Sequence, residues 1–223
     1  MNESILLTVI WVLPFVTALL TLPVRPASHR LIKQITLAGS AVNLLLIIWL
    51  TFRFMASVAA TGTGVGTRQT VLHFVYKTDW FQMPHISYHI GVDAISVLMM
   101  LLTGIVIFCG ILASWELESQ AKEFFALLNV LVGGVYGVFV SFDLFTFFLF
   151  YEVAVLPMYL LIGLWGTGRK EYSAMKLTLM LVAGSAFILA GLLALYFESG
   201  LFTFDLIELS QVEFPVSFQN WVF

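Results

Sequence analysis

Long, uninterrupted apolar runs dominate the chain, and short polar connections separate them. Each run has roughly the twenty residues that an α-helix needs to cross a bilayer. Transmembrane strands would show about ten residues of alternating polarity, and these runs are too long and too continuous for that. The pattern predicts an all-α membrane protein, a polytopic bundle of about six transmembrane helices, at residues 5–24, 31–54, 92–114, 124–142, 144–165 and 172–197.

Two stretches lack this continuous apolar pattern. The first, residues 55–91, is rich in Gly, Thr and Ala at 59–67, which indicates a turn. Its β-branched and aromatic residues at 70–76 and 86–90 favour a β-hairpin on the membrane surface. We therefore divide the chain into transmembrane helices 1 and 2 (1–54), an outer loop (55–91), transmembrane helices 3 to 6 (92–197) and an outer segment leading to a seventh helix (198–223).

Lysine and arginine gather in the odd-numbered connections between these helices. They are Arg25, Arg30 and Lys33 in the first, Lys122 in the third, and Arg169 and Lys170 in the fifth. Short basic connections stay on the cytoplasmic, or equivalent negative, side of a membrane. We therefore expect a multi-pass integral membrane protein whose N-terminus, outer loop and tail face the periplasmic side.

Composition narrows the classes of function. The chain is 61% hydrophobic and 10% charged, whereas soluble domains carry about 25% charged residues. Its net charge of −3 gives no indication of nucleic acid binding. The single cysteine, Cys109, excludes a zinc or iron–sulfur site built from thiolates and is expected to be a small buried residue. We expect no cofactor and no metal in this chain.

Glu152 is the only charged residue in the fifth apolar run. A charged carboxylate in hydrocarbon costs a few kcal/mol, so it should face the protein interior or water, where it can hold or pass a proton. Pro157 cannot donate a backbone hydrogen bond and frees a carbonyl near residue 153, which favours water nearby. We predict that Glu152 is a proton carrier. The alternative is a structural carboxyl that is hydrogen-bonded between helices.

Lys176 lies about one turn inside the sixth run. Its side chain either extends to the membrane surface or belongs to the proton path as a partner of Glu152. At 1.5 Å per residue, Glu152 is roughly 20 Å from the inner end of its helix and Lys176 about 6–8 Å. We therefore expect water or another polar residue, and not a direct ion pair, to connect the two.

Other polar residues have structural interpretations. Asp93 and Asp143 precede the third and fifth runs, where an aspartate caps the first N–H groups of a helix. The alternative for both is a role at a subunit contact or a water path. Asn43, inside the second run, is expected to hydrogen-bond between helices. Small residues on one face of the fourth run should permit close helix packing, namely Gly133, Gly134 and Gly137.

His85 and His89 are four residues apart, a spacing that suits a metal ion on a helix. Pro84 and the strand-like composition place them on a loop or strand, where four residues span about 13 Å. His73 lies in the other predicted strand. We therefore expect these histidines not to form a metal site.

Several of these segments resemble one known family. They are 91–103 (GVDAISVLMMLLT), 137–145 (GVFVSFDLF), 150–166 (FYEVAVLPMYLLIGLWG), 172–178 (YSAMKLT) and 202–206 (FTFDL). Together they resemble the N-terminal half of the antiporter-like membrane subunit M of respiratory complex I (NADH:quinone oxidoreductase), the counterpart of mitochondrial subunit 4. The resemblance extends over nearly the whole chain.

The resemblance implies the N-terminal part of a fourteen-helix antiporter-like fold and proton pumping coupled to NADH:quinone oxidoreduction. Glu152 falls on the essential glutamate of the family's fifth helix, and Lys176 on a lysine of its sixth. Family members are far longer, and their lysine-bearing, broken seventh helix would begin where this sequence ends. As it stands the chain would have an incomplete proton path, whether it is a fragment or a natural short protein.

The resemblance also implies partners and a location. The partners are other hydrophobic membrane-arm subunits of complex I and the lipid bilayer, without nucleic acid. NADH, FMN, iron–sulfur clusters and quinone are expected elsewhere in the complex. The location is the bacterial inner membrane, or the mitochondrial inner or thylakoid equivalent.

Two alternatives stay open. Subunits of multisubunit Na⁺/H⁺ antiporters and of membrane-bound hydrogenases share these helices and the glutamate, although 91–93 (GVD) and 156–159 (LPMY) favour complex I or its photosynthetic relative. The second alternative is a non-pumping membrane scaffold, in which Glu152 only joins helices.

Overall fold

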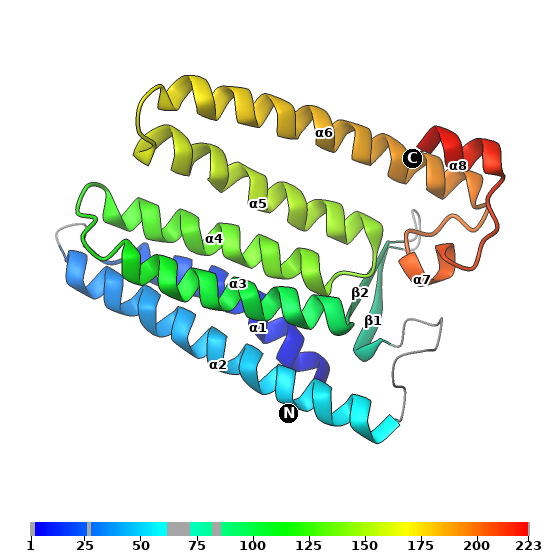
Figure 1. Ribbon diagram of the computed structural model, residues 1–223, viewed down its shortest axis with the longest axis horizontal. Helices are drawn as coiled ribbons and strands as arrows, with labels where there is room; N and C mark the ends of the chain where they lie inside the picture. The colour runs from blue at the N-terminus through cyan, green and yellow to red at the C-terminus, as the bar shows by residue number, and fades with distance from the viewer. Residues whose placement is uncertain (1–2, 26–27, 62–71, 82–85, 223) are drawn as a thin grey trace.

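The computed structural model describes residues 3–25, 28–61, 72–81 and 86–222. Within these ranges the elements follow one another along the chain (Figure 1). They are α1 (Glu3–Thr21), α2 (His29–Thr61), β1 (His73–Phe81), β2 (Ile86–Val92), α3 (Ala94–Ala113), α4 (Ala121–Val140), α5 (Leu144–Trp165), α6 (Lys170–Glu198), α7 (Leu206–Leu209) and α8 (Val216–Val222).

The long helices lie side by side, and successive helices run in opposite directions (Figure 1). α4 packs between α1 and α5, α5 also packs against α6, and α2 contacts both α1 and α3. The chain turns at one end of the bundle after α1, α3 and α5. It turns at the other end after α2, α4 and α6, and we call this the hairpin end because β1 and β2 lie there. The basic odd-numbered connections therefore share one end.

The predicted all-α polytopic bundle is confirmed. Five of the described helices, α2 to α6, are long and apolar enough to cross a membrane. The remaining apolar run, the first along the chain, forms α1, which is also apolar but shorter. Its 19 residues span about 28 Å at 1.5 Å per residue, close to the roughly 30 Å thickness of the hydrocarbon layer.

The predicted β-hairpin is present at residues 73–92. β1 and β2 pair antiparallel, with His73 opposite Val92 and Lys77 opposite His89. β2 begins at the predicted residue, whereas β1 begins three residues later than predicted and continues to Phe81. Residues 77, 78, 79 and 81 pair with β2 and so extend β1 beyond the predicted strand. Residues 70 and 71 of that prediction lie outside the described residues.

Backbone hydrogen bonds join the hairpin to two other segments at the same end of the bundle. Phe142, between α4 and α5, donates its N–H to the carbonyl of His89 at 2.8 Å. The carbonyl of Phe142 in turn accepts from the N–H of Leu206 at 2.9 Å, and Leu144 donates to Phe204 at 2.9 Å. The α4–α5 connection therefore lies between β2 and the segment that follows α6.

Glycines of α4 allow the close packing that the sequence predicted, but on two faces. A Cβ atom at Gly134 would lie 3.0 Å from the carbonyl oxygen of Phe150 on α5, and one at Gly137 would overlap the ring of Phe150. A Cβ atom at Gly133 would instead overlap the ring of Phe15 on α1. α4 therefore approaches both neighbours closely.

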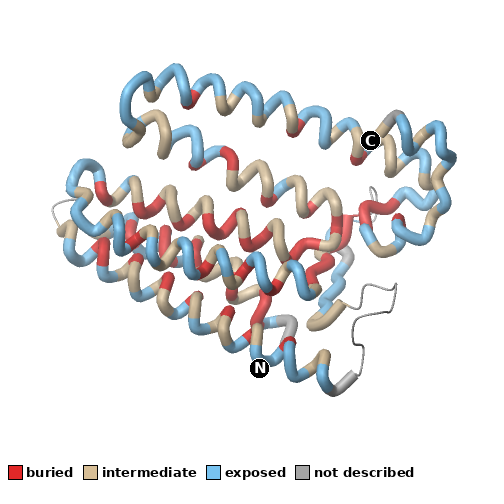
Figure 2. Tube along the Cα trace, viewed as in Figure 1, coloured by how far each residue is buried: buried red, intermediate tan, exposed pale blue. Residues whose placement is uncertain are grey.

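Burial differs strongly between the helices (Figure 2). In the most apolar stretch of α4, 44% of residues are buried, against 11% in α6. The prediction that Cys109 is buried was wrong, because its side chain is exposed on α3. α3 packs against α2 and α4 and turns its remaining face outward, where a small apolar thiol is compatible with lipid.

The structural interpretations of three polar residues are confirmed. Asp93 accepts a hydrogen bond from the backbone N–H of Ser96 at 2.7 Å and caps α3. Asp143 accepts from the backbone N–H of Thr146 at 2.9 Å and caps α5. Asn43 donates from α2 to a backbone carbonyl of α1 at 3.2 Å.

Candidate functional site

Glu152 lies in the middle of α5, eight residues after its first residue. That places it roughly 12 Å from the hairpin end of the helix at 1.5 Å per residue. Its side chain is half-buried. The carboxyl oxygen Oε1 is fully buried and has no hydrogen-bond partner among the described residues. A buried polar atom in this condition is costly, so its surroundings must stabilise it in another way.

The face of α5 that carries Glu152 packs against α6. Gly163 follows Glu152 by eleven residues, about three helical turns, and so lies on the same face. A Cβ atom at Gly163 would lie 3.7 Å from the Cβ of Ala174 on α6. Near the hairpin end, Phe148 of α5 and Leu192 of α6 belong to one hydrophobic cluster. The two contacts fix how the antiparallel helices are aligned.

This alignment places Ser185 of α6 at about the height of Glu152, because Ser185 follows Ala174 by the same eleven residues. Ser185 is buried, with 6% of its surface exposed. Its hydroxyl donates to the carbonyl of Val182 at 3.0 Å, within its own helix. The polar groups near the middle of the α5–α6 contact are therefore a carboxyl and a hydroxyl that retains its acceptor lone pairs.

Pro157 lies inside α5 without ending it, and the helix continues to Trp165. Because proline has no backbone N–H, the carbonyl of Val153 loses its donor four residues on. This carbonyl follows Glu152 directly. The predicted break in the hydrogen bonding of α5 is therefore present one residue from the carboxyl.

Lys176 and Glu152 are not brought together. Lys176 is exposed on α6 and follows Ala174, which faces α5, by two residues or about 200° around the helix axis. Along that axis it lies about nine residues, or roughly 13 Å, from the height of Glu152. Within the described ranges Lys176 forms no hydrogen bond or ion pair. Its role in the proton path stays a prediction.

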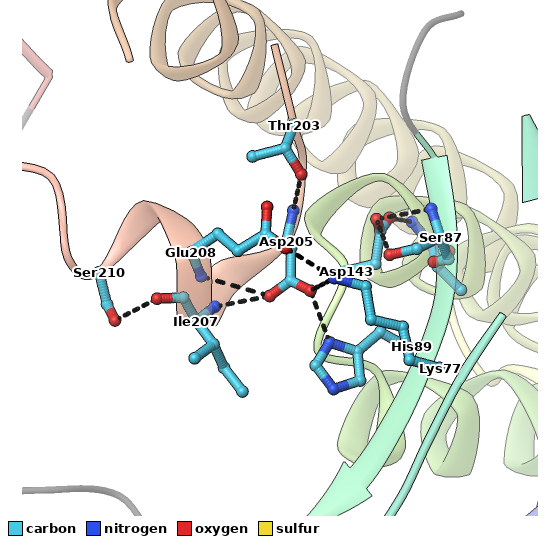
Figure 3. A network of polar contacts seen from close by, with 10 residues as sticks. Lys77, Ser87, His89, Asp143, Thr203, Asp205, Ile207, Glu208 and Ser210 are labelled. Carbon is cyan, nitrogen blue, oxygen red and sulfur yellow. Dashed lines mark hydrogen bonds and ion pairs between the residues drawn. The ribbon is translucent and has the colours of Figure 1, made fainter. Parts of the chain in front are cut away.

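A second polar cluster lies at the hairpin end (Figure 3). Asp205, the N-cap of α7, accepts hydrogen bonds through Oδ2 from Lys77 Nζ at 2.7 Å and from His89 Nδ1 at 2.9 Å. Its Oδ1 accepts from the backbone N–H of Ile207 at 2.9 Å. Lys77 also donates to Glu208 Oε1 at 2.7 Å. We call Lys77, His89, Asp205 and Glu208 the hairpin-end cluster.

The charges of this cluster stabilise one another. Burial of the Asp205 carboxyl favours its neutral form, but the hydrogen bonds from His89 and Lys77 outweigh this and hold its pKa well below the usual range. Burial likewise lowers the pKa of Lys77, yet its hydrogen bonds to Asp205 and Glu208 raise it to about 12. An ionised carboxylate only accepts, so His89 Nδ1 carries the proton.

Asp143 does more than cap its helix. Its Oδ2 accepts hydrogen bonds from the backbone N–H of Ser87 at 3.1 Å and from the Ser87 hydroxyl at 3.3 Å. The carboxyl is 1% exposed and therefore joins β2 to the start of α5 inside the protein (Figure 3).

The three histidines considered from the sequence as metal ligands have different surroundings. His85 lies outside the described residues. His73 contacts the hydroxyl of Ser57 through Nδ1 at 3.1 Å, and His89 binds Asp205. In the described part of the chain no three His, Cys, Asp or Glu side chains gather as a metal site would need. Sequence reasoning missed Lys77 and Asp205, although an aspartate ahead of 206–209 (LIEL) is a helix-cap signal.

Known proteins with similar sequences match nearly the whole chain. The family model described as NADH:quinone oxidoreductase/Mrp antiporter, transmembrane, matches residues 141–222. NAD(P)H-quinone oxidoreductase chain 4 of Gloeobacter violaceus is 33% identical over 97% of this chain and 39% of its own length. NADH-quinone oxidoreductase subunit M of Rhodobacter capsulatus is 32% identical over 97% of this chain and 41% of its own. The chain is therefore similar in sequence to the antiporter-like membrane subunits of complex I.

Solved structures agree on the fold. A chain of respiratory complex I from Thermus thermophilus has a TM-score of 0.78 at 23% identity, over 97% of this chain and 41% of that one. A chain of the archaeal membrane-bound sulfane sulfur reductase has a TM-score of 0.67 at 20% identity, over 92% and 39%. The protein is thus a multi-pass membrane protein with part of the antiporter-like fold. It spans about two fifths of the length of these longer relatives.

Proposed function

We propose that this chain is the N-terminal part of a proton-translocating membrane-arm subunit of an NADH:quinone oxidoreductase, with Glu152 as a proton carrier. One observation carries the proposal. Glu152 is the single charged residue of a membrane-spanning helix, and its Oε1 is buried between helices without a hydrogen-bond partner among the described residues. A carboxyl in this setting gains most from water or from exchange of its proton.

The surroundings of Glu152 support exchange better than a fixed structural bond. A structural carboxyl would use both oxygens in hydrogen bonds between helices. Ser185, level with it on α6, already donates its hydroxyl within its own helix, and the carbonyl freed by Pro157 can accept from water but not from an ionised carboxyl. Together these groups offer acceptors to a water molecule beside the carboxyl.

We propose that further helices and neighbouring subunits complete the proton path. α5 and α6 expose large apolar side chains such as Leu156 and Phe187. We propose that further helices and other hydrophobic membrane-arm subunits cover part of these faces and that lipid covers the rest. Electron transfer through FMN and iron–sulfur clusters from NADH to quinone would take place in other subunits, in a bacterial inner membrane or its mitochondrial or thylakoid equivalent.

A subunit of a Na⁺/H⁺ antiporter or of another membrane-bound respiratory complex is the second candidate. The matching family model includes Mrp antiporters, and the sulfane sulfur reductase has the same fold. The relatives compared above, and another from Synechocystis at 30% identity, are named NAD(P)H- or NADH-quinone oxidoreductase, which favours the first proposal. A non-pumping scaffold differs from both, because it would not need the proton of Glu152.

The experiment replaces Glu152 in the intact assembly. In Glu152→Gln, proton pumping should fall to near zero, because the amide keeps the shape but cannot release a proton. Glu152→Asp should keep part of the activity, since its carboxyl is drawn back by one methylene. The measurement is the proton-to-electron ratio at equal subunit content in sealed vesicles. A sodium-dependent signal with no link to NADH oxidation would favour the antiporter.

Glu198→Gln is the matched control. Glu198 ends α6 and is exposed, so the same loss of charge there should leave pumping unchanged. Assembly should survive both changes. Full coupled pumping in Glu152→Gln would leave the scaffold as the better account of this carboxyl.

A further inference from the structure

A small cavity with several polar groups in its lining lies among α1, α2, α3 and α4, on the far side of α4 from the α5–α6 contact. It leaves about 10 Å³ for the centre of a water molecule, about the least that holds one water. Its lining includes Asn43 and Ser40 of α2, Thr17 of α1, Gly104 of α3 and Tyr136 of α4. A single water needs two to four polar partners to be held in such a space.

Asn43 supplies the first partner. It is 4% exposed, and its Nδ2 donates to the carbonyl of Ile10 at 3.2 Å. That carbonyl is available because Pro14, four residues on in α1, has no N–H to donate. A carbonyl only accepts, so the nitrogen of the amide must face Ile10 and the oxygen must face elsewhere. Asn43 Oδ1 is fully buried and has no partner among the described residues.

Tyr136 supplies the second partner. Its side chain is 1% exposed, and its hydroxyl lies beside the cavity wall that Gly104 forms. A Cβ atom at Gly104 would lie 3.4 Å from Tyr136 Oη. Within the described residues the hydroxyl forms no hydrogen bond, so it is free to donate into the cavity.

The other hydroxyls of the lining already have partners for their protons. Thr17 donates to the carbonyl of Leu13 at 2.6 Å, and Ser40 donates to that of Leu37 at 2.9 Å. Both bonds stay within one helix. Each oxygen retains lone pairs and can still accept. The cavity therefore presents the Tyr136 hydroxyl as a donor without a bond of its own, together with several acceptors. Asn129 of α4 also lines the cavity and already donates to the carbonyl of Phe125 at 2.7 Å. Asn43 Oδ1 is the fully buried acceptor that has no partner among the described residues.

We propose that this cavity binds one ordered water molecule, which accepts from the Tyr136 hydroxyl and donates to Asn43 Oδ1. Its second proton is directed to Thr17 or Ser40. The water completes the hydrogen bonding around the break that Pro14 makes in α1, so it joins three helices through Asn43 and Tyr136. This site is independent of Glu152 and does not rest on the proposed function.

Radiolytic labelling of the intact assembly in ¹⁸O water tests the site. Hydroxyl radicals formed from a bound water oxidise the side chains that touch it, however deeply they are buried. Tyr136 should therefore incorporate ¹⁸O at least fivefold faster than Phe125, a fully buried aromatic residue of the same helix that does not line the cavity. Equal rates at Tyr136 and Phe125 would overturn the proposal.

Two variants separate a bound water from local opening of the bundle. Asn43→Leu removes the acceptor, and Gly104→Ala adds a methyl group beside the Tyr136 hydroxyl, so each should lower labelling of Tyr136 to the rate of Phe125. If Asn43→Leu does not assemble, Gly104→Ala decides alone. Unchanged labelling of Tyr136 in the assembled variants would mean that solvent reaches it by opening, and the water site would be rejected.

Discussion

The carboxylate of Asp205 accepts a hydrogen bond from His89 Nδ1 at 2.9 Å, although the two residues are 116 positions apart in the chain. Both side chains are almost fully buried, with 2% and 5% of their surface exposed. Lys77 reaches the same carboxylate oxygen from the neighbouring strand. The hairpin is thereby held to the segment that follows α6, in addition to the backbone bonds through Phe142.

Loss of the Asp205 charge should release this segment. In Asp205→Asn the amide can still cap α7, but Lys77 and His89 lose a charged acceptor, which costs on the order of 2 kcal/mol. Hydrogen exchange of the backbone at 203–210 and at β2 should become faster. Glu208→Gln is the control, because Glu208 is half-exposed and such surface pairs contribute about 0–1 kcal/mol. Equal effects of the two changes would contradict the dominant role of Asp205.

The hairpin-end cluster should also depend on pH in a defined way. The pKa of Asp205 is lowered on folding. Its ionised carboxylate therefore stabilises the fold at pH values above the usual aspartate pKa, and this stabilisation is lost as pH falls below about 4. The pKa of Lys77 is raised from 10.5 to about 12, so its contribution is lost only as pH rises through that window. Protection of residues 203–210 against hydrogen exchange, corrected for intrinsic exchange, should fall both in the acid range and in the alkaline range. In Asp205→Asn the loss of protection at acid pH should disappear.

The two capping aspartates provide a matched pair. Asp93→Ala removes a helix cap and should destabilise the protein by about 1 kcal/mol. Asp143→Ala removes a cap and both hydrogen bonds to Ser87, so it should cost at least 1 kcal/mol more. Thermal unfolding of the assembly measures the difference. If the two variants unfold at the same temperature, the link between Asp143 and β2 contributes nothing measurable.

Apolar run length predicted the helices well because a span must bury its length in hydrocarbon. α5 was predicted at 144–165 and has those bounds. α2 was predicted to end at residue 54 but continues to Thr61, since its backbone hydrogen bonds do not require apolar side chains. The hairpin-end cluster was not predicted, because Lys77 and Asp205 meet across 128 positions and no local pattern encodes such a pair. Glu152 was found because a charge in an apolar run stands out locally.

Close packing of α4 against α5 should be sensitive to a single methyl group. Gly137→Ala places a Cβ atom into the ring of Phe150 and should cost about 1–3 kcal/mol through overpacking. Gly110→Ala on α3 is the control, because nothing lies within 4 Å of a Cβ atom there. Alanine favours a helix over glycine by about 1 kcal/mol, so Gly110→Ala should be neutral or stabilising. A stabilising Gly137→Ala would mean that the α4–α5 contact has room to adjust.

Substitution of Lys176 tests how far the proton path extends. The path either reaches the outer face of α6, where Lys176 lies, or is confined to the α5–α6 contact. It is exposed and points away from α5, so in the longer relatives' fold it would contact other helices or extend to the membrane surface. If it belongs to the path, Lys176→Ala should lower coupled pumping while assembly persists. Lys176→Arg should rescue poorly, because a guanidinium does not give up its proton. Lys170→Ala is the control, since Lys170 at the start of α6 donates to the carbonyl of Leu164 at 2.7 Å. Wild-type pumping in both Lys176 variants would assign the side chain to the membrane surface and leave Glu152 as the carrier without it.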